Sequence, residues 1–280
     1  MEKINVNDYS SVIAKKPYSG VSKKYAFIST KQVVDEFARR GWTPTFIRES
    51  RSYAPARVGY QKHIIRFREE GKKLVKGELI PEIAFGNSHD TSTKARMCMA
   101  YFLVKCENGL IVPDSLIDDL DLSIRHVGDV ASKVKLAIEA VNEYSNPIRK
   151  EIKRYKEWEF SPITAVDDKR YPNGIIPFAE DAIDIRYPGN EDRARRVSSI
   201  ELLRPVRRSD EGNSLWKVFN VIQEKFQKGT YHIFKSSDET DIMDEEALRR
   251  ARMSKPLKDV KEIIRVNMGL WELMHEYSLN

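Results

Sequence analysis

The stretch YQKHIIRFRE, residues 60–69, decides the fold, because strand-forming residues alternate there with long basic ones. Side chains of a β-strand point alternately to the two faces of a sheet, so Arg66 and Arg68 share one face. Ile65 and Phe67 share the other face, which we expect to be core. The stretch therefore predicts a strand with one apolar and one basic face.

Similar patterns on both sides of this stretch predict a small antiparallel sheet. The further expected strands are 42–52, 79–86 and 97–105. Pro44 suits only an edge or the start of its strand. Asn108-Gly109 is a hairpin turn signal, and residues 110–112 after it predict a short return strand. We therefore expect a β-meander.

Helix signals surround the meander. Ser29 and Gln32 have capping-box spacing, and Gly41 is suited to end the helix that they begin. Apolar residues at helical spacing predict a helix from about 127 to 141. Asn146-Pro147 then reads as the N-cap and first residue of another helix, which reaches Trp158.

The C-terminal half changes character at about residue 159. Proline and glycine interrupt residues 159–212, where we expect an irregular lobe with one strand near Ile183 to Tyr187. Helices are expected at 213–228, closed by Gly229, at 244–253 and at 256–277. The predicted class is α+β, an antiparallel sheet flanked by helices, with an irregular lobe and C-terminal helices. The expected parts are an N-terminal arm (1–24), an α+β core with basic strands (25–158), a lobe rich in proline and acidic residues (159–212) and a C-terminal helical part (213–280).

Positive charge is concentrated in one segment, which we call the basic block, residues 39–76. It holds 11 Lys and Arg against 3 Glu, a net charge of +8, whereas the whole chain carries +6. Charge concentrated in this way on strands is typical of a polyanion-binding face. Its alternatives are an ordinary solvated basic face and the binding of another acidic partner.

Aromatic residues among the cations favour nucleic acid, because cations contact phosphates and rings stack on unpaired bases. We expect the block to bind single-stranded DNA without a cofactor. Arg48, Arg51, Arg57, Lys62, Arg66 and Arg68 would hold phosphates, and Tyr53 and Tyr60 would stack. The full candidate set of nucleic-acid-binding residues is Arg48, Arg51, Tyr53, Arg57, Tyr60, Lys62, His63, Arg66 and Arg68.

A second polar cluster, Asn87-Ser88-His89-Asp90, follows an expected strand. Together with His126 it is a candidate ligand site, and a tight turn held by Asx-type hydrogen bonds is the alternative. The five histidines show no metal-site spacing, and no glycine-rich phosphate loop is present. We therefore expect no catalytic residue, metal or cofactor, although a metal-dependent nuclease using His89, Asp90 and His126 remains a third hypothesis.

The chain shows no apolar run near the ~18 residues of a membrane helix and no signal-peptide pattern at its start. Cys98 and Cys106 are expected to be reduced core thiols. We accordingly expect a protein of the bacterial cytoplasm with no membrane partner.

Several phrases in this order resemble the phage- and plasmid-encoded family catalogued as domain of unknown function 932. They are GYQKHIIRFR (59–68), PEIAFGNSHD (81–90), VKCENGL (104–110), RH (125–126) and LWKVFNVIQE (215–224). The family usually has glycine where Thr91 stands, and Arg-Gly-Gly where residues 228–230 read Lys-Gly-Thr.

The resemblance implies a phage or mobile-element origin and supplies no established activity. The expected layout of helices and basic sheet is similar to that of phage single-strand annealing proteins of the RecT and Erf types, an analogy of fold alone. It implies a role in recombination, annealing or replication, with assembly into homo-oligomers. The alternative is an anti-defence protein that binds a host protein through its acidic lobe, Glu180 to Asp192.

Overall fold

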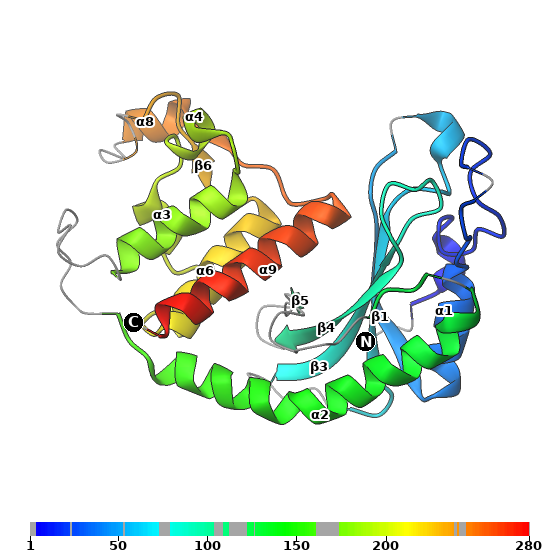
Figure 1. Ribbon diagram of the computed structural model, residues 1–280. Helices are drawn as coiled ribbons and strands as arrows, with labels where there is room; N and C mark the ends of the chain where they lie inside the picture. The colour runs from blue at the N-terminus through cyan, green and yellow to red at the C-terminus, as the bar shows by residue number, and fades with distance from the viewer. Residues whose placement is uncertain are drawn as a thin grey trace. The chain divides into compact units, whose positions relative to one another are not determined.

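The computed structural model describes residues 4–22, 24–52, 54–72, 79–103, 109–111, 122–125, 127–160, 174–237, 240 and 245–279 (Figure 1). The chain divides into two compact units. The first comprises residues 1–146 and 258–264, and the second comprises 147–257 and 265–280. This division falls earlier than the expected core boundary at 158, and residues 258–264 return to the first unit.

The first unit is built on a five-stranded antiparallel sheet, which confirms the predicted α+β class. Its strands lie in sequence order, each paired with the next. They are β1 (Trp42–Glu49), β2 (His63–Glu69), β3 (Leu79–Asn87), β4 (Arg96–Leu103) and β5 (Gly109–Ile111). The pairing of β1 with β2 shifts register between Pro44 and Phe46, a bulge that accommodates the proline.

Helix α1 (Thr30–Arg39) packs against one face of this sheet. Ser29 caps it by accepting a hydrogen bond from the Gln32 amide, as predicted. Phe37 of α1 stacks on Phe67 of β2 with ring centroids 4.0 Å apart, so the apolar face of β2 is core as predicted. The buried side chains of this core include Val33, Phe37, Ile65, Phe67, Ile83, Phe85, Met97 and Met99.

The N-terminal segment, which we expected to be a polar arm, contains buried residues. It contains the short 3-10 helix η1 (Val6–Asp8), and Ser11 and Val12 are buried. The Ser11 amide donates to Oε1 of Glu49 at 2.7 Å, which attaches the segment to the end of β1.

Helix α2 (Val130–Glu157) is continuous through Pro147, where we expected a new helix to start. Proline lacks an amide hydrogen and costs a helix interior about 3 kcal/mol. Apolar residues buried on both sides of it, including Val141, Ile148 and Ile152, offset that cost. The division between the two units falls at this proline.

The second unit is largely helical (Figure 1). Its elements are α3 (Ile175–Arg186), α4 (Glu191–Ala194), α5 (Ser199–Leu203), α6 (Leu215–Lys228), α8 (Glu245–Arg250), most of α9 (Val260–Tyr277) and a small ladder of β6 (His232–Ile233) with β7 (Arg252–Met253). Helix α6 begins after Ser214 and ends at left-handed Gly229, close to the predicted bounds. No helix in the described ranges is long and apolar enough to cross a membrane.

Candidate nucleic-acid interface

Arg66 and Arg68 share one face of β2, as predicted, but both are buried. Oε1 of Glu82 accepts hydrogen bonds from Nε and Nη2 of Arg68 at 3.1 and 2.7 Å. Nη1 of Arg66 lies 3.5 Å from Oε2 of the same carboxylate, which is fully buried. A buried charge requires partners of this kind. The burial corrects the expectation that these two arginines contact phosphates on an exposed face.

Arg48 of β1 extends the same basic face and is half-buried. Its guanidinium carbon lies 5.3 Å from the centroid of the Phe46 ring, and that of Arg66 lies 4.5 Å from the same centroid. Burial lowers the pKa of both arginines. Phe46 therefore contacts two cations, and Arg48 is the more exposed of them.

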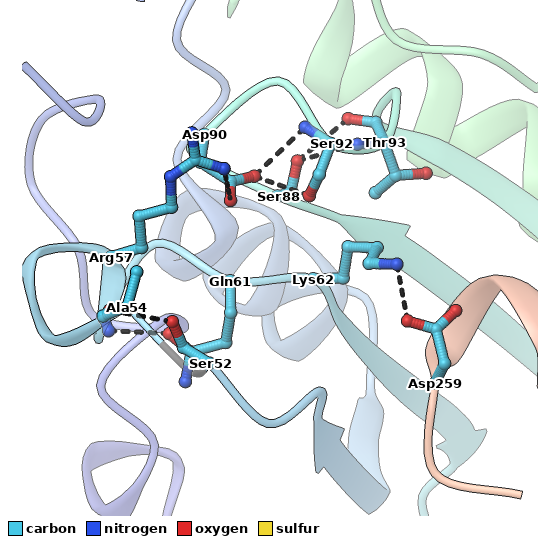
Figure 2. Close-up of polar contacts among 11 residues, drawn as sticks. Ser52, Ala54, Arg57, Gln61, Lys62, Ser88, Asp90, Ser92, Thr93 and Asp259 are labelled. Atoms are coloured by element: carbon cyan, nitrogen blue, oxygen red, sulfur yellow. Dashed lines mark hydrogen bonds and ion pairs between the residues drawn. The ribbon is translucent and has the colours of Figure 1, made fainter. Parts of the chain in front are cut away.

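Two exposed cations of the basic block, Arg51 and Arg57, lie in the loop between β1 and β2, residues 50–62. Arg57 is the last residue of the short 3-10 helix η2 (Pro55–Arg57). Its Nη1 lies 3.9 Å from Oδ2 of Asp90, and its side chain is 52% exposed (Figure 2). The Asp90 carboxylate is only 7% exposed and contacts one nitrogen of Arg57, so the other donors of this half-exposed guanidinium can face a phosphate.

Lys62 ends this loop and is less accessible than Arg57. Its Nζ lies 2.5 Å from Oδ2 of Asp259 (Figure 2). Asp259 precedes α9 and its Oδ1 accepts hydrogen bonds from the amides of Lys261 and Glu262 at 3.0 and 3.2 Å. Lys62 can therefore hold a phosphate only by exchanging a carboxylate that is fixed in place.

Tyr60 lies in the same loop, half-buried, with its ring centroid 5.7 Å from that of Tyr18. Arg57 lies over the Tyr18 ring at 5.5 Å. Tyr18 belongs to the segment that we expected to be an arm, so it was not among the predicted site residues. The sequence feature that could have indicated Tyr18 as a site residue is the neighbouring pair of cations, Lys15 and Lys16.

His63, a predicted nucleic-acid contact, is fully buried beside His89. Its Nε2 lies 2.8 Å from Thr30 Oγ1 and its Nδ1 lies 3.0 Å from the Gln61 carbonyl oxygen. The two histidine rings are 5.3 Å apart. His63 thus belongs to an interior network between α1, β2 and the end of β3. This corrects the prediction that His63 contacts nucleic acid.

The carbonyl partners assign the tautomers of the two histidines, because a carbonyl oxygen only accepts. His63 carries its hydrogen on Nδ1, and its Nε2 accepts from the Thr30 hydroxyl. His89 Nε2 donates to the Ser11 carbonyl at 2.9 Å. His89 Nδ1 is buried and has no hydrogen-bond partner among the described residues. Burial is the main cause that lowers the pKa of each histidine to about 4.

Asn87 supports this network from the end of β3. Its Nδ2 donates to the Ile28 carbonyl and to Thr30 Oγ1, both at 3.0 Å. Its Oδ1 accepts from the Ser88 amide at 2.8 Å. Because His63 Nε2 carries no hydrogen, the Thr30 hydroxyl donates to it while accepting from Asn87.

The turn after His89 is held by its own side chains (Figure 2). Asp90 Oδ1 accepts from the amide and the hydroxyl of Ser92 at 3.0 and 2.5 Å, and Ser88 Oγ bonds to the backbone of Thr93. Thr91 has φ +66°, the only positive φ among described residues other than glycine. This is the geometry of the Asx-type turn that was the alternative to a ligand site.

Two candidate residues, Tyr53 and His126, lie outside the described residues, as does Cys106. Cys98 is a buried free thiol, and burial raises its pKa to about 11. In the described part of the chain, no three His, Cys, Asp or Glu gather closely enough to hold a metal ion. The nuclease reading through His89, Asp90 and His126 stays a hypothesis, because one of its three residues is outside the described ranges.

Comparison with known proteins identifies a family match and two relatives of this chain. The model of the family described as "Domain of unknown function (DUF932)" matches residues 17–258. UPF0380 protein YafZ of Escherichia coli K12 is 31% identical over 222 residues, 78% of this chain and 74% of YafZ. UPF0380 protein YfjQ of the same organism is 31% identical over 221 residues, with the same shares. No solved structure gives a significant match.

Proposed function

This chain belongs to the DUF932 family, whose description names no activity, and we propose that it binds nucleic acid without catalysing a reaction. The proposed ligand is single-stranded DNA. One observation carries the proposal: the exposed Arg51 and Arg57 of the +8 basic block lie in the loop of residues 50–62, which also contributes one of two neighbouring tyrosine rings. Single-strand binding uses two kinds of group, cations that contact phosphates and accessible aromatic rings on which bases stack.

The proposed division of work follows exposure. Arg51 and Arg57 contact phosphates. Arg48 and Lys62 contact phosphates only after breaking their contacts with Phe46 and Asp259, respectively. Arg66 and Arg68 act indirectly by neutralising Glu82 beneath the basic face. The stacking role of Tyr53 stays a prediction.

The cellular setting belongs to the same proposal. A cofactor-free single-strand binder serves annealing, recombination or replication of a phage or mobile element in the bacterial cytoplasm, and works as a homo-oligomer along the strand. The alternative, an anti-defence protein that binds a host protein through its acidic lobe, Glu180 to Asp192, stays a prediction.

Fluorescence anisotropy with a labelled single strand and its duplex, across a salt series, tests the proposal. Replacing Arg51 and Arg57 by serine is expected to make the slope of log affinity against log salt shallower by about 0.7 for each phosphate that the variant no longer neutralises. Arg149→Ser with Lys150→Ser, exposed on α2 outside the block, is the matched control and should leave the slope unchanged. No binding by the parent at low salt, or equal slopes in all proteins, would refute the proposal.

A further inference from the structure

We propose that Tyr18 and Tyr60 form a platform on which one unpaired base of the bound strand stacks. The inference rests on the proposed function and adds to it the group that distinguishes an unpaired strand from a duplex. The two ring planes are inclined at 60°, with centroids 5.7 Å apart. Rings tilted in this way do not cover each other as stacked rings do, and both side chains are half-buried and therefore partly open to solvent.

The backbone holds both tyrosines through one residue, His89. The Tyr18 amide donates to the His89 carbonyl at 2.9 Å, and the His89 amide donates to the Tyr60 carbonyl at 2.9 Å. The His89 side chain is itself buried and bonded to Ser11. The platform is therefore positioned before any ligand arrives, which lowers the entropy lost on binding.

Charge around the platform matches a nucleic-acid strand. Arg57 lies over the Tyr18 ring at 5.5 Å and is half-exposed, so it can contact the phosphate next to a stacked base. Lys15 and Lys16, both exposed, immediately precede Pro17 and Tyr18. Asp90 is the nearby acid, and its largely buried carboxylate lies 3.9 Å from one nitrogen of Arg57, which leaves other donors of the half-exposed guanidinium to face a phosphate.

An unpaired base is the occupant that these features fit. Bases in a duplex are already stacked on their neighbours and present only their edges, whereas an unpaired base offers its whole face. Ring stacking is indifferent to sequence, because every base has a π-face. The platform would thus give strand selectivity without sequence selectivity.

The test compares an oligothymidylate with an abasic strand of equal length, which keeps the phosphates and lacks the bases. The parent should bind the oligothymidylate at least about fivefold more tightly, the lower limit for one stacked base. Tyr18→Leu with Tyr60→Leu should bind both strands equally, at the affinity of the parent for the abasic strand. Tyr18→Phe with Tyr60→Phe should restore the preference, and Tyr144→Leu on α2 is the matched control.

The outcomes separate this inference from the proposed function. If the parent binds both strands tightly and equally, or if the leucine variant keeps the preference, the platform is refuted and the phosphate contacts remain. If the parent binds neither strand at low salt, the proposed function fails and the platform fails with it. A folded leucine variant is verified by its circular dichroism and its unchanged salt slope.

Discussion

Mild acid should destabilise the first unit through His63 and His89. Each is neutral and buried with a pKa of about 4, against about 6.5 in an unfolded chain. The unfolded state therefore binds more protons between these values, so stability is complete above pH 6.5 and falls as the pH drops towards 4. From pH 7 to pH 5 each histidine should cost about 2 kcal/mol of unfolding free energy. Ordinary carboxylates titrate mostly below this window.

His89→Gln isolates one of these contributions. The glutamine amide can donate to the Ser11 carbonyl as His89 Nε2 does, and His89 Nδ1 has no partner to give up in the described part of the chain. We expect similar stability at pH 7 and about 2 kcal/mol less loss between pH 7 and 5 than in the parent. Urea unfolding read by hydrogen exchange on peptides from β2 and β3 reports on the first unit, to which both strands belong. Parallel stability curves for parent and variant would refute the buried neutral assignment.

Three further substitutions test the described geometry by urea unfolding. Thr91→Gly should stabilise by about 1 kcal/mol, because φ +66° strains a β-branched residue, and a destabilised variant would contradict this. Glu82→Gln should destabilise by about 3–5 kcal/mol by leaving two buried guanidiniums against a neutral amide, and a loss below about 1 kcal/mol would argue against that pairing. Gly229→Ala should cost about 2–4 kcal/mol, since a Cβ at φ +68° would lie 2.5 Å from backbone atoms of Lys255 and Pro256, and a neutral effect would show that this contact relaxes.

Local signals predicted several regular elements of both units well. The Ser29 cap, the alternation in residues 63–69 and the left-handed glycine after α6 each depend on neighbours within a few residues, so they are visible in sequence. The expected strand near Ile183 to Tyr187 is wrong, because α3 covers residues 175–186. Pro177 suggested a break in any long element, yet it lies in the first turn of α3, where an amide hydrogen has no helical partner.

The candidate site depended on long-range contacts that local patterns do not contain. Alternation placed Arg66 and Arg68 on one face, but only the pairing of β2 with β3 brings Glu82 to them. A lone carboxylate inside the apolar stretch LIPEIAFG was the signal that a buried cation would be needed. Tyr18 was missed for the same reason, since its contact with Tyr60 joins distant segments.

The bond from His89 to Ser11 has a consequence for biosynthesis. The two residues are 78 positions apart, so at about 5–20 residues per second His89 follows Ser11 out of the ribosome by roughly 4–16 seconds. Throughout that interval the Ser11 carbonyl lacks the His89 imidazole that donates to it, and β3 is incomplete. The segment around Ser11 therefore completes its docking only after translation has passed the turn at Asp90.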